Sequence, residues 1–158
     1  MTRETISATV MIDAAPETVF AVLADPAQHP GIDGTGWLRE SRTTDPVTAS
    51  GQLFGMAMYH ELHPDKDYEI VNLVTVFDAP KSIAWEPGQY GPDGELSRGG
   101  WCWRYDLRPV DSSRTEVTLT YDWSGATPEA RRVLEFPPFP PEHLDRSLAN
   151  LGRLATSA

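Results

Sequence analysis

Residues 101–123 have the sequence WCWRYDLRPVDSSRTEVTLTYDW, which indicates two long strands joined by a tight turn. Apolar and polar side chains alternate on both sides of residues 111–114, the period expected of strands with one buried face. The turn residues, DSSR, favour a hairpin connection. The alternation predicts an inward face made of Trp101, Trp103, Tyr105, Leu107, Val117, Leu119, Tyr121 and Trp123.

Several shorter strands are expected before this hairpin. Residues 6–12 alternate in the same way, and residues 53–62 show a similar pattern. The second of these strands would place four side chains on one face, namely Phe54, Met56, Met58 and His60. Further strands are expected over residues 37–43, 68–77 and 82–85. The segment 68–77 is apolar on both faces, so the sequence leaves the direction of Asn72 open.

Segments rich in glycine or proline interrupt the regular elements. Residues 29–36 contain three glycines and a proline, which predicts a tight irregular loop. Residues 88–100 contain five glycines and are expected to form a mobile loop. Residues 136–141 contain four prolines, which cannot all lie in a helix interior. A helix over residues 128–135 is therefore expected to end there.

Two amphipathic helices complete the pattern. The first is expected to begin at Pro16 and to end at the Asp25-Pro26 pair. The second begins at Glu142 and carries one apolar stripe at helical spacing, formed by Leu144, Leu148, Leu151 and either Leu154 or Ala155. A helix, a run of antiparallel strands and a covering helix are typical of an α+β domain, which we expect to span residues 1–158.

Composition and charge exclude several classes of function. The 158 residues hold 13 Lys and Arg against 23 Asp and Glu, for a net charge of −10. Such a charge disfavours nucleic acid as a partner. No run of about 18 apolar residues suggests a membrane span, and the N-terminus has no apolar signal segment. With only one cysteine, Cys102, the chain is expected to be cytoplasmic.

The aromatic side chains of the long hairpin suggest more than a packed core. Buried indole N–H and phenol O–H groups need hydrogen-bond partners, which a core of Val, Ile and Leu would not require. These rings therefore suggest a concave sheet around a space that holds a ligand or water. The alternative is an ordinary aromatic core, which is the commoner use of such residues.

Two stretches of the chain resemble a known family. Residues 12–26, IDAAPETVFAVLADP, and residues 78–85, DAPKSIAW, are similar to the START/Bet v 1-like (SRPBCC) superfamily in its polyketide cyclase/dehydrase branch. The resemblance implies a helix-grip fold, in which a curved antiparallel sheet of about seven strands surrounds a long C-terminal helix and encloses a cavity. The superfamily includes carriers, cyclases and chaperone activators, so function must be argued from the site. The segments 29–36 and 136–141 depart from the family pattern.

Candidate catalytic residues are His29 and Asp33, together with Tyr105 and Tyr121. A carboxylate beside a histidine can orient it and raise its basicity, which suits proton transfer. A phenol on the inward face could stabilise a developing oxyanion. The structural alternatives are a turn at Asp33, a solvated loop at His29 and phenols that bond only to the backbone.

Candidate ligand-binding residues are the inward aromatic and sulfur-containing side chains Phe54, Met56, Met58, His60, Trp101, Trp103 and Trp123. The alternative to ligand binding by His60 is a position at the sheet edge, with its ring in solvent. The stretch His60-Glu61-Leu62-His63 resembles a zinc motif, but a strand directs His60 and His63 to opposite faces, so no metal is predicted. Motifs for nucleotide, flavin, iron–sulfur and serine-hydrolase chemistry are absent from the sequence, and no cofactor is expected.

These observations predict a protein that binds a small apolar, aromatic or polyketide-like molecule in an internal cavity, working as a cyclase or dehydratase without a cofactor. The alternative is a non-catalytic carrier or sensor of lipids or other small molecules with the same cavity. A third hypothesis is a protein–protein module of the chaperone-activator type. The sequence does not predict the oligomeric state or the identity of the ligand.

Overall fold

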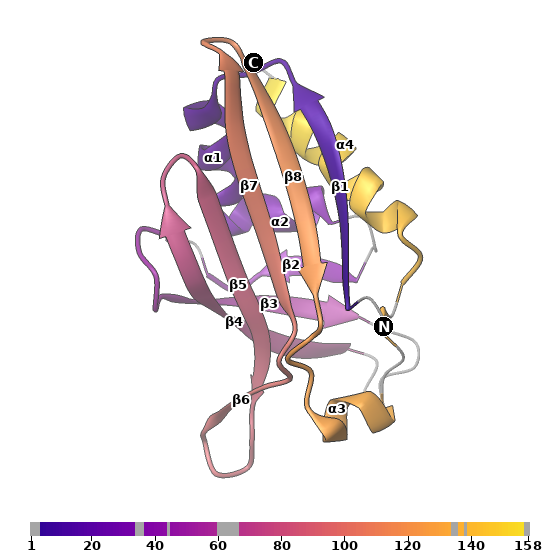
Figure 1. The fold of residues 1–158 in the computed structure, drawn as a ribbon. Helices are drawn as coiled ribbons and strands as arrows, with labels where there is room; N and C mark the ends of the chain where they lie inside the picture. The colour runs from indigo at the N-terminus through magenta and orange to yellow at the C-terminus, as the bar shows by residue number, and fades with distance from the viewer. Residues whose placement is uncertain are drawn as a thin grey trace.

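The computed structural model describes residues 4–33, 37–43, 45–59, 67–133, 136–137 and 139–156. Its class is α+β, with one curled antiparallel sheet and a C-terminal helix (Figure 1). The strands of the sheet follow the spatial order β1-β8-β7-β5-β4-β3-β2, and β6 pairs with β5. Their bounds are β1 (Thr5–Ile12), β2 (Leu38–Ser41), β3 (Leu53–Tyr59), β4 (Asp67–Asp78), β5 (Ser82–Tyr90), β6 (Leu96–Arg98), β7 (Cys102–Asp111) and β8 (Arg114–Asp122).

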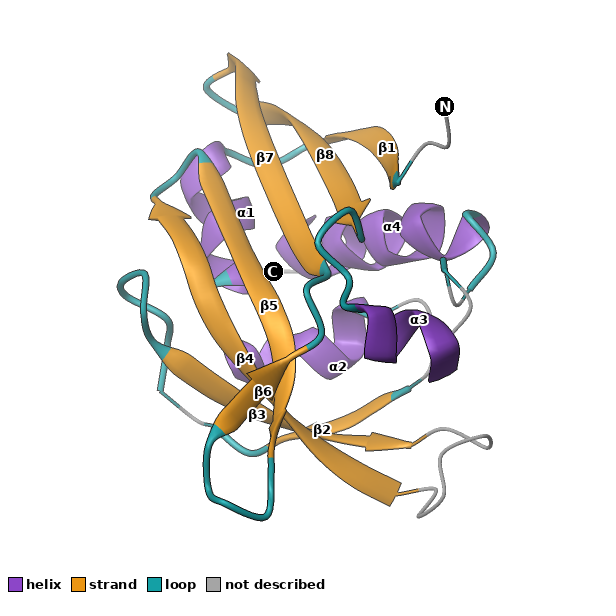
Figure 2. Cartoon of the chain, turned by 60° about the horizontal axis from the view of Figure 1, so that its bottom comes forward, coloured by secondary structure: helices purple, strands orange, loops and turns teal. Residues whose placement is uncertain are grey.

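The helices are α1 (Pro16–Leu23), the 3-10 helix η1 (Pro26–Gln28), α2 (His29–Ile32), α3 (Pro128–Val133) and α4 (Glu142–Thr156). Helices α1, α2 and α4 lie on the concave side of the sheet (Figure 2), whereas α3 lies beyond the ends of β7 and β8 (Figure 1). Helix α4 contacts β1, β8, α1 and α2. This arrangement is compatible with the helix-grip fold.

The hairpin β7–β8 has the predicted register. Trp103 pairs with Tyr121 and Tyr105 pairs with Leu119, so inward side chains face the same layer on both strands. The turn is held by the Asp111 carboxylate, which accepts a hydrogen bond from the Ser113 amide at 2.9 Å. The alternation therefore predicted both strands correctly, and their inward face with the exception of Trp101, which precedes β7 and is half-buried.

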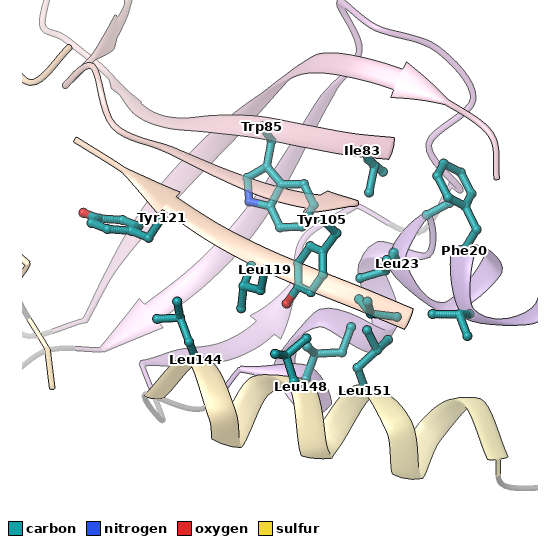
Figure 3. Packing of buried hydrophobic residues seen from close by; sticks show 14 of the residues in the cluster. Phe20, Leu23, Ile83, Trp85, Tyr105, Leu119, Tyr121, Leu144, Leu148 and Leu151 are labelled. Carbon is teal, nitrogen blue, oxygen red and sulfur yellow. The ribbon is translucent and has the colours of Figure 1, made fainter. Parts of the chain in front are cut away.

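The apolar stripe of α4 is also confirmed. Leu144, Leu148 and Leu151 are buried against the sheet, and Ala155 continues the stripe rather than Leu154, which is half-buried. Figure 3 shows these leucines beneath the side chains of the sheet. The helix thus supplies the apolar cover that a sheet with one buried face requires.

Two segments expected to be loops contain regular structure. In the segment 29–36, residues 29–32 form α2 with Pro30 in its first turn, and residues 34–36 lie outside the described residues. Just before it, residues 26–28 form η1, and the Asp25 carboxylate accepts a hydrogen bond from the Ala27 amide at 3.1 Å. In the second segment, β5 continues to Tyr90 and pairs with β6, for example Gly88 with Arg98. The expectation of a mobile loop over 88–100 was therefore wrong for much of that segment.

Candidate functional site

One group of inward side chains comes from α2 and three strands. We call His29, Phe54, Trp85 and Tyr105 the His29 cluster. The His29 ring lies 5.1 Å from the ring of Phe54 and 4.9 Å from that of Trp85. Trp85 in turn stacks on Tyr105 at 5.9 Å. Figure 3 shows Trp85 and Tyr105 directed from the sheet toward the leucines of α4.

A second group gathers around Phe139, which precedes α4. We call Phe139, Trp103, Tyr121 and Trp123 the Phe139 cluster. Phe139 stacks on Trp103 at 5.4 Å with an interplanar angle of 16°, and it meets Tyr121 edge-on at 5.0 Å. Tyr121 also lies 5.8 Å from Trp123. The predicted residue Trp101 is half-buried and packs instead against Phe136, so it lies at the margin of this cluster.

The buried histidine His29 is held by a backbone carbonyl. Its Nε2 donates to the Leu23 oxygen at 2.7 Å, and the side chain is 5% exposed. Burial lowers the pKa of His29, although the Leu23 carbonyl and the Asp25 charge oppose this shift. The ring is therefore neutral near pH 7, with the proton on Nε2 and a free lone pair on Nδ1.

Asp33 has different partners. Its Oδ2 accepts hydrogen bonds from the amides of Trp37 and Leu38, at 3.0 and 3.1 Å. The side chains of His29 and Asp33 thus bind different backbone groups. Within the described structure no hydrogen bond joins the two. The structure places both near the inward face, but their role in proton transfer stays a prediction.

The two candidate phenols are buried. Burial raises the pKa of Tyr105, and the Asp33 charge adds to the shift. Burial likewise raises the pKa of Tyr121, with Cys102 as a smaller cause. Both groups therefore remain protonated at neutral pH and can act as hydrogen-bond donors.

Asn72 is an inward polar residue that the sequence could not place. It is 3% exposed and lies on β4 between Phe54 of β3 and Pro87 of β5. Its Oδ1 is buried and has no hydrogen-bond partner in the described part of the chain. Its pairing with Phe54 and Pro87 is regular, and a register shift follows further along β4, between Val74 and Val76.

The remaining predicted ligand-binding residues lie mostly on β3. Phe54, Met56 and Met58 are buried on its inward face, as the alternation predicted. His60 lies outside the described residues. Over the ranges that the structure describes, no group of three or more His, Cys, Asp or Glu side chains could hold a metal ion.

Among the residues that the structure describes, the predicted internal cavity is not shown. Two hollows lie on the outside of α1, one lined by residues from Glu17 to Gln28 and the other by residues around Pro16, Lys81 and Pro109. Neither is lined by a member of the two clusters. The inward rings instead contact one another, with Phe139 seated among those of β7 and β8.

The His29 environment predicts a pH dependence of stability. In the unfolded chain a histidine titrates near pH 6.5, whereas the folded ring has a lowered pKa. The contribution of this ring is thus complete above about pH 6.5 and is lost as the pH falls toward the folded pKa. We expect the free energy of unfolding, measured in urea, to drop over this acidic range.

The matched variant is His29→Gln, whose amide can donate to the Leu23 carbonyl without titrating. In this variant the decrease in unfolding free energy at acidic pH should be smaller, because the contribution of the His29 ring is missing. An identical pH profile for both proteins would show that other groups, such as carboxylates, cause the whole effect.

Comparison with known proteins supports the fold. No family model matches the chain. The sequence is 26% identical over 121 residues to the uncharacterized protein Rv0088 of Mycobacterium tuberculosis, a match that covers 77% of this chain and 48% of that protein. The chain therefore spans about half the length of this curated relative.

Solved structures with a similar fold come from several bacteria. A protein of Arthrobacter aurescens has a TM-score of 0.69 and 16% identity, covering 97% of this chain and 86% of that one. Protein NE0264 of Nitrosomonas europaea has a TM-score of 0.67 and 16% identity, over 95% and 92% of the two chains. Protein Ms6760 of Mycobacterium smegmatis has a TM-score of 0.63 and 19% identity, over 98% and 92%. At these identities the likeness establishes the fold alone.

No helix among the described residues is both long enough and apolar enough to cross a membrane.

Proposed function

We propose that the protein binds a small apolar molecule with an aromatic or polyketide-like ring system between the inward face of the sheet and α4. The observation that carries this proposal is a face of aromatic rings interrupted by buried polar groups. Asn72 Oδ1 lacks a partner within the described chain, and Tyr105 supplies a buried donor. An apolar surface with a few oriented polar groups is typical of small-molecule sites.

The position of Phe139 supports the aromatic character of the ligand. Its ring comes from the proline-rich segment that connects α3 to α4, where it stacks on Trp103 and meets Tyr121 edge-on. The inward face thus accommodates an aromatic ring that belongs to no strand. A ligand ring could use the same stacking and edge-on contacts.

The contacts of His29 and Asp33 favour binding without chemistry. Both side chains are committed to backbone groups, and His29 is neutral. We therefore place a carrier or sensor function first. A cofactor-independent cyclase or dehydratase is the second candidate, favoured by the His29 and Tyr105 rings, which both contact Trp85. There, Nδ1 could accept a proton while the phenol donates to an oxyanion.

A fluorescence titration tests the proposed site. An aromatic probe such as 2-naphthol should change the intrinsic tryptophan fluorescence and raise the melting temperature, because it binds the folded state. Phe54→Leu should weaken binding several-fold, since Phe54 contacts His29 and Trp85. The control is Tyr90→Leu, which changes a side chain that is 57% exposed. Equal losses in both variants, or no binding by the wild type, would contradict the proposal.

Mass spectrometry separates the two candidate functions. Cyclisable and dehydratable aromatic ketones that bind should be recovered unchanged after long incubation with a carrier. Conversion by the wild type that His29→Gln and Tyr105→Phe each reduce by about 10²-fold or more, with affinity retained, would instead establish the catalytic function.

A further inference from the structure

Asn72 is a polar residue at a position that the surrounding fold would fill with an apolar one. Its cross-strand neighbours are Phe54 and Pro87, neither of which has a side-chain donor. It is almost fully buried, and its Oδ1 has no hydrogen-bond partner in the described structure. A buried carbonyl oxygen without a partner is costly, whereas a leucine, which has the same number of side-chain heavy atoms, would carry no such penalty.

The surroundings of Asn72 specify what could satisfy it. Its cross-strand neighbour Phe54 contacts His29 and Trp85, so Asn72 lies next to a member of the His29 cluster. An oxygen atom of this kind can only accept a hydrogen bond. A molecule stacked on these rings would meet it with a hydroxyl or N–H group on the edge of its own ring.

The charge of the region disfavours an anionic molecule. The Asp33 carboxylate is near enough to Tyr68 and Tyr105 to contribute to the raised pKa of both phenols. The chain as a whole carries a net charge of −10. A neutral hydroxyl group therefore fits this position better than a carboxylate or phosphate.

We infer that the ligand is a neutral hydroxyaromatic molecule whose O–H donates to Asn72 Oδ1. This inference rests on the proposed function and adds to it the recognition of one chemical group. It also explains why an asparagine stands within an apolar strand: its stability cost is recovered when the ligand binds.

Two probes that differ in a single hydrogen-bond donor test the inference. The donor is present in 2-naphthol and absent in 2-methoxynaphthalene, which has the same ring system. In calorimetric titrations the wild type should bind 2-naphthol about tenfold more tightly or better, because the ether leaves Asn72 unsatisfied. In Asn72→Leu the two affinities should agree within about twofold, since neither probe then meets an acceptor.

The variants also report on folding. Asn72→Leu should melt at or above the wild-type temperature, because it removes an unsatisfied buried atom. Asn72→Ala introduces a side chain smaller than the native one and should also lose the preference for 2-naphthol. This second variant separates the loss of the acceptor from any steric effect of leucine. Equal binding of the probes by the wild type, or a preference that survives in both variants, would overturn the inference and leave the proposed function intact. Binding of neither probe to the wild type would overturn both.

Discussion

Phe139→Ala is expected to lower the free energy of unfolding by about 3 to 5 kcal/mol, the usual cost of truncating a buried phenylalanine. The side chain is 6% exposed and contacts Trp103, Tyr121 and His143. Its removal would leave a space lined by aromatic rings, in the position where we propose that a ligand ring can stack. Urea denaturation measures the loss, and 2-naphthol should restore part of it by binding the folded variant.

The control for this prediction is Phe136→Ala. Phe136 belongs to the same segment but is half-buried and packs on Trp101, so its truncation should cost clearly less. A loss below about 1 kcal/mol for Phe139→Ala would mean that the ring contributes no more than an ordinary surface residue. The segment would then not be anchored by this ring.

Leu148→Ala should lower the free energy of unfolding by about 2 to 5 kcal/mol. Leu148 is buried at the centre of the α4 stripe, where the helix covers the sheet (Figure 3). Leu53→Ala deletes the same atoms from a side chain that is 40% exposed, and it should change stability by about 0.5 kcal/mol or less. Similar losses in the two variants, measured in urea, would show that α4 does not provide the cover of the core.

Much of the fold could be predicted from local patterns. The alternation around residues 111–114 predicted a hairpin, because a strand with one buried face must alternate. The spacing of Leu144, Leu148 and Leu151 predicted the covering helix, because a helix with one buried face has apolar residues three or four positions apart. Such signals are local, since each depends only on the geometry of its own element. The sequence missed α2, where the first-turn prolines favoured a helix despite the neighbouring glycines.

The site was harder to predict because it depends on contacts between distant segments. No local pattern indicates that Phe139 stacks on Trp103, or that the His29 ring reaches Phe54 and Trp85. The direction of Asn72 follows from its pairing with the buried Phe54, which the apolar pattern of residues 68–77 does not indicate. A polar residue within an otherwise apolar strand was the one available signal, and it is the residue whose oxygen lacks a partner in the described structure.

The most direct test of a ligand site inside the sheet uses the methionine methyl groups. Met56 and Met58 are buried on the inward face of β3, whereas Met11 on β1 is 47% exposed. In protein labelled with ¹³C at the methionine methyl groups, the ring current of bound 2-naphthol should shift the NMR signals of Met56 and Met58 in a saturable way and leave that of Met11 in place. Saturable binding with shifts confined to Met11, or with none at Met56 and Met58, would contradict a site between the sheet and α4.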